Sequence, residues 1–153
     1  MEAVIFNQIA LNRSRTLEIA GELAESFADV VPHGFNNNIR WHLGHIVTTQ
    51  ERLAYRLIGE KLELPEELMS LFLNGTKPAD WQTAPPDIPT LKRLLQQQPD
   101  RIRERLEGRL DEPLTVPFKQ LATLKEALIF SIGHEATHAG YMLALKRAVQ
   151  AQL

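Results

Sequence analysis

Two histidines four residues apart are the clearest chemical signal in this chain. They are His134 and His138, in the segment His-Glu-Ala-Thr-His, which lies inside a long run with helical apolar spacing. Residues four apart on a helix lie on one face, one turn above the other, so both imidazoles can bind the same metal ion. A secure site needs a third ligand. The chain has no cysteine, and its other histidines are His33, His42 and His45.

The same segment matches H-E-x-x-H, the helical motif of zinc proteases in which the glutamate is the general base. Such proteases usually take a further ligand from a downstream segment. The 15 residues after His138 contain no His, Asp, Glu or Cys. We therefore reject the protease interpretation and expect the third ligand upstream, in Trp-His-Leu-Gly-His at residues 41–45. His45 and His42 are the alternatives there, whereas His33 lies in a predicted turn and is expected to be solvated.

Glu135 and Tyr141 are the weak catalytic candidates. Glu135 directly follows His134, so it points about 100° away from that histidine around a helix. It is interpreted as a surface charge or as an acceptor for an imidazole N–H, with a general base as the alternative. Tyr141 comes three residues after His138 and falls on the metal-facing side. It either bonds a metal-bound water or substrate, or simply closes the pocket.

Four long amphipathic segments must position these residues, and no strand pattern accompanies them. Asparagines at 36–38 provide an N-cap for the second segment, and Thr123 with Glu126 forms a capping box for the fourth. Pro99 removes a backbone hydrogen bond inside the third segment, where we expect a kink or short break. The sequence predicts an all-α four-helix bundle, with helices near residues 3–29, 38–59, 88–107 and 123–149. The connector over residues 60–86 is interpreted either as a site wall or as a structured crossover.

Composition sets limits on the class of protein. The chain has 153 residues, which suits a single domain over 1–153, and a formal net charge of −2. This charge gives no indication of a nucleic-acid partner, which usually requires a basic face. The N-terminus lacks the pattern of a signal peptide, and no apolar run approaches the roughly 20 residues that cross a bilayer. We expect a soluble, cytoplasmic protein without a membrane partner.

Two short motifs together resemble the DinB-like family, which includes the YfiT-like metal-dependent hydrolases. They are Asn-Asn-Ile-Arg-Trp-His-Leu-Gly-His-Ile at residues 37–46 and His-Glu-Ala-Thr-His-Ala-Gly-Tyr at residues 134–141. The resemblance implies an up-down-down-up helix order and a divalent ion, often nickel or zinc, on His45, His134 and His138. It also implies frequent homodimers, and some relatives are thiol-dependent S-transferases. The family often has Gln at the position of Tyr141.

Three neutral imidazoles suit zinc, nickel and similar ions, whereas carboxylate-poor surroundings disfavour calcium and magnesium. A three-ligand site leaves positions open for water or substrate, which is the catalytic arrangement. Two classes of function stay open. One is a metal-dependent enzyme on a small molecule, either a hydrolase or a transferase that uses a low-molecular-weight thiol. The other is a non-catalytic bundle in which the ion joins the second and fourth helices in a structural or stress-related role.

Overall fold

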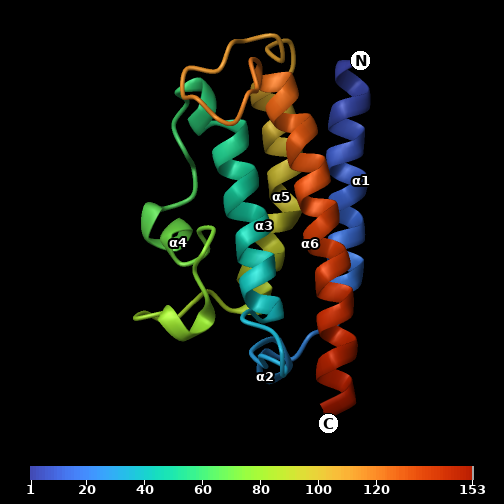
Figure 1. The fold of residues 1–153 in the computed structure, drawn as a ribbon. Helices are drawn as coiled ribbons and strands as arrows, with labels where there is room; N and C mark the ends of the chain where they lie inside the picture. The colour runs from blue at the N-terminus through green and yellow to red at the C-terminus, as the bar shows by residue number, and fades with distance from the viewer. Residues whose placement is uncertain (153) are drawn as a thin grey trace.

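The computed structural model describes residues 1–152, which form a helical bundle (Figure 1). Two short helices, α2 (Glu25–Ala28) and α4 (Glu66–Ser70), lie in the connections, as do the 3-10 turns η1 (Arg56–Ile58) and η2 (Pro78–Asp80). Within residues 1–152 the only β pairing is an isolated bridge between Pro113 and Thr123, so the predicted all-α class is confirmed. The long helices are α1 (Glu2–Ala20), α3 (Ile39–Ala54), α5 (Ile88–Leu106) and α6 (Leu124–Gln152).

The two middle helices of the bundle run parallel. In Figure 1, α1 runs downward, α3 and α5 run upward, and α6 runs downward again. The helices α1 and α3 each contact both α5 and α6. This is the predicted up-down-down-up order. It requires the connector after α3 to bring the chain back along the bundle, and that is the role of the segment containing α4 (Figure 1).

The first two predicted helices are too long. The helix expected over 3–29 ends at Ala20, because Gly21 has φ 53 and ψ −146 and leaves the helical region. The apolar spacing beyond this point persists because Leu23 and Phe27 still pack against the core from a largely non-helical segment. The helix expected over 38–59 ends at Ala54 and continues only as a 3-10 turn. The other two predicted helices differ from α5 and α6 by no more than three residues at either end.

Local caps fix the starts of the helices that carry the histidines. The Asn38 side chain accepts the backbone N–H of Trp41 at 2.8 Å, which starts α3. At the start of α6, Thr123 Oγ1 accepts the Glu126 N–H at 3.4 Å and Glu126 Oε2 accepts the Thr123 N–H at 3.3 Å. Both pairs satisfy backbone donors that a helix start leaves free, and the predicted capping box is confirmed.

Pro99 does not break α5, contrary to the expectation of a short break. A proline at this position cannot donate to the carbonyl of Leu95, four residues earlier. Arg13 of α1 supplies the missing donor, because its Nη1 donates to the Leu95 carbonyl at 2.7 Å. The proline therefore creates an acceptor inside the bundle that a buried guanidinium uses.

A buried polar layer crosses the bundle between two apolar core clusters, one near α2 and the other near the N-terminus. Arg13 donates to Glu135 at 2.8 and 3.1 Å and to Gln98 at 3.2 Å. Gln98 donates in turn to Glu51 at 3.0 Å, and Thr16 donates to Glu135 at 2.8 Å. The layer joins all four long helices. Because Glu135 faces inward, its position fixes the rotation of α6 and so the direction of the neighbouring histidines.

No helix among residues 1–152 combines the length and the apolar character needed to span a membrane.

Candidate metal centre

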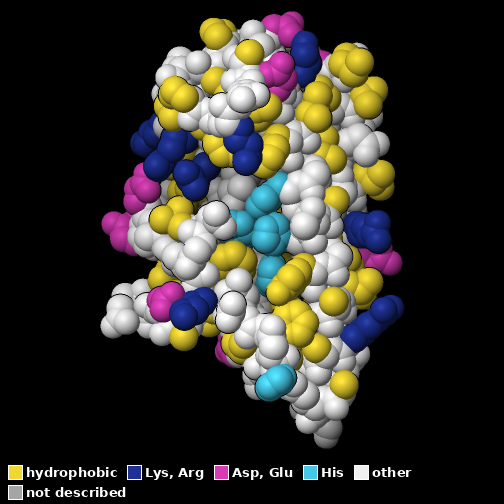
Figure 2. All heavy atoms as spheres, viewed as in Figure 1, with side chains coloured by type: hydrophobic (Ala, Val, Ile, Leu, Met, Phe, Trp, Pro, Cys, Tyr) yellow, Lys and Arg dark blue, Asp and Glu magenta, His cyan; other side chains and the backbone are white. Residues whose placement is uncertain are grey.

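Three histidines from two helices converge on one point. His45 comes from α3, His134 and His138 come from α6, and one ring nitrogen from each lies within 4.8 Å of the others. His45 Nε2 is 3.1 Å from His134 Nε2. On the molecular face shown in Figure 2, imidazole side chains form a central group, and another imidazole lies apart from it near the bottom. The structure thus brings together the three residues that the sequence indicated as ligands.

His45 is held in a defined tautomer. Its Nδ1 lies 2.7 Å from the Phe72 carbonyl oxygen, and because a carbonyl can only accept, Nδ1–H is the donor. The lone pair is therefore on Nε2, the atom that faces His134. The Trp41 ring stacks on the His45 ring, with centroids 4.5 Å apart and planes 11° apart. Such support around a ligand histidine is typical of metal sites, where it fixes the ring orientation.

Phe72 is the site residue that sequence reasoning missed. It lies just after α4 in the connector, is fully buried, and contributes a backbone atom rather than a functional side chain. Its ring packs against Gly44, where an added Cβ would lie 2.4 Å from two ring carbons. A glycine next to His45 was the available signal, since it indicates a close approach by another segment. The connector therefore supports the site as well as crossing the bundle.

His42 contacts the site but lies outside the group of three. Its Nδ1 is 2.9 Å from His138 Nδ1, so one of these two nitrogens carries the shared hydrogen. If His138 donates, its Nε2 lone pair is free for a metal; if His42 donates, His138 Nε2 carries the hydrogen instead. Metal binding through His138 Nε2 thus requires His42 to accept. His33 is exposed and lies outside the group.

The histidines are held in the neutral form that binds metal. Burial, together with neighbouring imidazoles, lowers the pKa of His134 to about 4 and that of His138 to about 3. The same causes lower the pKa of His42 to about 3. Burial also lowers the pKa of His45, although its bond to the Phe72 carbonyl opposes the shift. Protons therefore compete weakly with a metal at neutral pH.

Glu135 points away from the imidazoles. The residue is 2% exposed, so the expectation of a surface charge is wrong. Both carboxylate oxygens bond to Arg13, and one also accepts the hydroxyl of Thr16. Within residues 1–152 it makes no hydrogen bond to an imidazole. The H-E-x-x-H spacing is therefore present without the geometry of a protease, because the glutamate belongs to the polar layer.

Tyr141 lies at the rim of the site. It is 44% exposed, and its ring centroid is 4.8 Å from that of His42 and 5.6 Å from that of Phe35. Its hydroxyl has no hydrogen-bond partner among the described residues. The aromatic contacts place this side chain beside His42, where it borders the histidine group.

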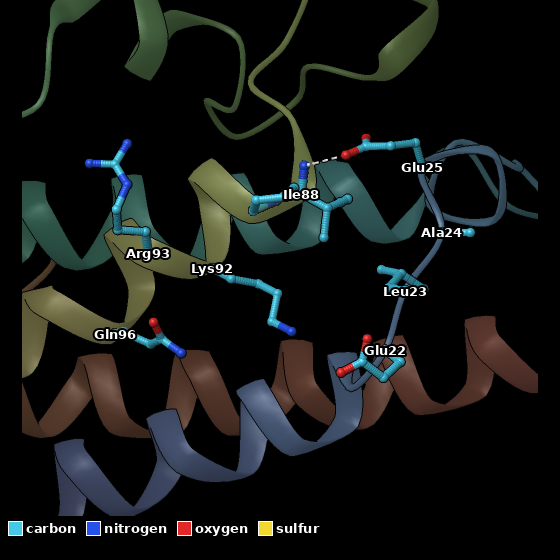
Figure 3. A pocket seen from close by; sticks show the side chains of 9 residues that line it. Glu22, Leu23, Ala24, Glu25, Ile88, Lys92, Arg93 and Gln96 are labelled. Atoms are coloured by element: carbon cyan, nitrogen blue, oxygen red, sulfur yellow. Dashed lines mark hydrogen bonds between the residues drawn. The ribbon is translucent and has the colours of Figure 1, made fainter.

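A cavity of about 500 Å³ lies away from the histidines, between the segment after α1 and the start of α5 (Figure 3). Two of its polar groups make structural hydrogen bonds. Glu25 accepts the Ile88 N–H at 2.9 Å, and Lys92 donates to the Gly21 carbonyl at 2.9 Å. We interpret this cavity as part of the joint between α2 and α5.

A helical bundle with three converging histidines defines a candidate metalloprotein. The chain belongs to the DinB superfamily, whose family model matches residues 8–142. It is also similar to a solved structure described as the conserved protein of locus from Enterococcus faecalis. That similarity has a TM-score of 0.71 at 14% identity and covers 99% of this chain and 98% of the other, so it bears on the fold alone. Comparison with curated protein sequences gave no match.

The donor set fits a borderline transition metal. Imidazole nitrogens suit zinc and nickel, and no carboxylate belongs to the group that the described residues form. His45 is buried at the base of the site, whereas His134 and His138 are half-buried at its edge. The three histidines can hold a metal ion close to solvent.

Proposed function

We propose that this protein is a metal-dependent enzyme that binds zinc or nickel at His45, His134 and His138 and transfers the sulfur of a low-molecular-weight thiol to an electrophile. The observation that carries this proposal is an all-imidazole site in which Glu135 is turned away. Membership of the DinB superfamily supports the metal.

An open coordination position favours catalysis over a structural role. Structural zinc sites normally have four protein ligands, whereas the group formed by the described residues has three. The helices α3 and α6 also pack through Ile46, Met142 and Leu145, which belong to one apolar core cluster. Because these contacts already join the helices, an ion is not needed to hold them together.

Thiol transfer fits the site better than hydrolysis does. Hydrolysis by H-E-x-x-H enzymes uses a carboxylate to take a proton from water. Here the Glu135 carboxylate accepts hydrogen bonds from Arg13 and Thr16, so it is not available for that step. A zinc or nickel ion would supply thiol activation directly, since a coordinated thiol is deprotonated by the metal. The protein's own contribution is then to hold three neutral imidazoles and to leave one side of the site open.

The proposal is tested by loading the apo-protein with Zn²⁺ or Ni²⁺ and assaying a panel of cellular thiols with 1-chloro-2,4-dinitrobenzene. We expect conjugation that requires both the metal and the protein, and that His138→Ala abolishes. An aryl ester assayed without thiol measures hydrolysis. Metal-dependent ester cleavage without thiol conjugation would favour a hydrolase, and stoichiometric metal with neither activity would favour a non-catalytic bundle.

We also propose that two copies of the chain associate as a homodimer. The outer face of α6 supports this, because Ile129 and Leu143 are exposed there. Sedimentation equilibrium of the purified protein should give twice the chain mass, whereas a monomer at micromolar concentration would contradict the proposal.

A further inference from the structure

Arg52 lies on the same face of α3 as the metal-site histidine. It follows His45 by seven residues, which is two helical turns or roughly 10 Å along the axis. Thr49 lies between them, with its hydroxyl 3.5 Å from His45 Nε2, so this face of α3 borders the site. Helical side chains lean toward the N-terminus of their helix. The Arg52 side chain is therefore long enough, and leans in the right direction, to reach toward His45.

Arg52 has no acidic partner among residues 1–152. Its side chain is half-buried, and Nε is buried without a hydrogen-bond partner. The next arginine on the chain, Arg56, pairs with Glu66. A buried donor that lacks a partner is costly to the fold. An unpaired guanidinium beside a candidate catalytic site indicates a partner that the chain itself does not supply.

A second cation lies beside the part of α6 that precedes His134. Lys119 has a left-handed backbone conformation, with φ 52. Its ammonium group lies 5.4 Å from the centroid of the Phe130 ring. Phe130 precedes His134 by one turn of α6. Lys and Arg side chains gather beside the histidines on the face shown in Figure 2. The positive charge of Arg52 also reaches His45, whose pKa is lowered mainly by burial and further by this charge.

We propose that Arg52 binds an anionic group of the thiol substrate, a carboxylate or a phosphate, while the sulfur of the same molecule occupies the three-histidine site. A guanidinium presents a planar set of donors that matches either anion with two parallel hydrogen bonds. This inference rests on the proposed function and narrows its substrate class to acidic thiols. The alternative is a long side chain that lays its stem on the core and extends its head into water. In that case the guanidinium would not distinguish acidic thiols from neutral ones, so titrating both kinds of thiol separates the two interpretations.

The test uses Co²⁺-loaded protein and the absorption change that follows when a thiolate binds cobalt. Carboxylate thiols from 3-mercaptopropionate to 6-mercaptohexanoate are each titrated against the mercaptoalcohol of the same chain length. Phosphopantetheine is titrated against pantetheine. We expect one acidic thiol to bind at least 10-fold more tightly than its neutral counterpart. The pair that shows this preference distinguishes carboxylate from phosphate, and the best chain length reports the distance from the metal to Arg52.

The Arg52→Gln variant should reduce this preference to less than 2-fold without weakening the neutral thiol, and Arg52→Lys should retain part of it. Arg56→Gln is the matched control, because it removes the same charge one turn away on the chain, and it should retain the full preference. Equal binding of acidic and neutral thiols by the native protein, or an unchanged preference in Arg52→Gln, would overturn the inference and leave the thiol function standing. If no thiol alters the cobalt spectrum, the proposed function fails and the inference fails with it.

Discussion

A single methyl group added at Gly44 should disturb the metal site through Phe72, the residue that supports His45. A Cβ at this position would lie 2.4 to 2.5 Å from three carbons of the Phe72 ring, whereas ordinary contact begins near 3.4 Å. Gly44→Ala therefore forces the ring, or α3 itself, to move by about 1 Å. The backbone carbonyl of Phe72 accepts the Nδ1–H of His45 at 2.7 Å. A shift of Phe72 therefore also disturbs the hydrogen bond that orients this ligand.

The expected magnitudes follow from opposing effects. Alanine gains about 1 kcal/mol over glycine inside a helix, whereas overpacking a core costs about 1–3 kcal/mol. Because Phe72 is fully buried, we expect the cost to prevail and the free energy of unfolding to fall by up to about 2 kcal/mol. Loss of a hydrogen bond that supports a ligand typically weakens metal affinity by about 10- to 100-fold. Urea denaturation of the apo-protein and competitive Zn²⁺ titration measure the two effects separately.

Gly133→Ala is the matched control, since Gly133 adjoins His134 in α6 as Gly44 adjoins His45 in α3. A Cβ at Gly133 would have no neighbour within 4 Å, so this variant should gain up to about 1 kcal/mol and keep its metal affinity. The reasoning is refuted if Gly44→Ala matches the native protein in both stability and affinity. It is also refuted if the two alanine variants behave alike.

Three further outcomes are expected. Arg13→Met should lower the free energy of unfolding by about 3–5 kcal/mol in urea denaturation, because it leaves the buried Glu135 carboxylate without its cation, and a loss below about 1 kcal/mol would contradict the role of the polar layer. Without metal, the urea midpoint should fall as the pH is lowered from about 6.5 toward 4. His134 and His138 have lower pKa values in the folded protein than in the unfolded chain, so the unfolded chain binds more protons over this range and is favoured at low pH. A urea midpoint that rises as the pH is lowered would contradict this. A chelator at neutral pH should lower the melting temperature of the metal-loaded protein while circular dichroism shows the helices intact, and unfolding on chelation would indicate a structural ion.

Local signals predicted much of the helical framework. The capping box of Thr123 with Glu126 gave the start of α6 to within one residue, because the bonds that start a helix are made within one turn. The end of α1 was wrong because apolar periodicity continues past Gly21 in residues that pack on the core without being helical. Gly21 itself was the available signal of the break.

The site was predictable as far as side-chain type and helical spacing could indicate it. Spacing paired His134 with His138, and the short motif around His45 indicated the third ligand. The same spacing turned Glu135 away from His134, but its partner Arg13 is 122 residues distant in sequence. The support from Phe72 involves a backbone carbonyl, which any residue could supply. Such contacts depend on how the helices pack, so they cannot be predicted from a local sequence pattern.

Metal stoichiometry of histidine variants tests the central claim most directly. Protein purified without an affinity tag, loaded with Zn²⁺ or Ni²⁺ and freed of excess ion, is measured by inductively coupled plasma mass spectrometry. The native chain and His33→Ala should each retain one ion per chain, and His45→Ala, His134→Ala and His138→Ala should each lose it while remaining helical. Full metal retention by any of these three variants, or a native protein that binds no metal, would contradict the assignment of the site.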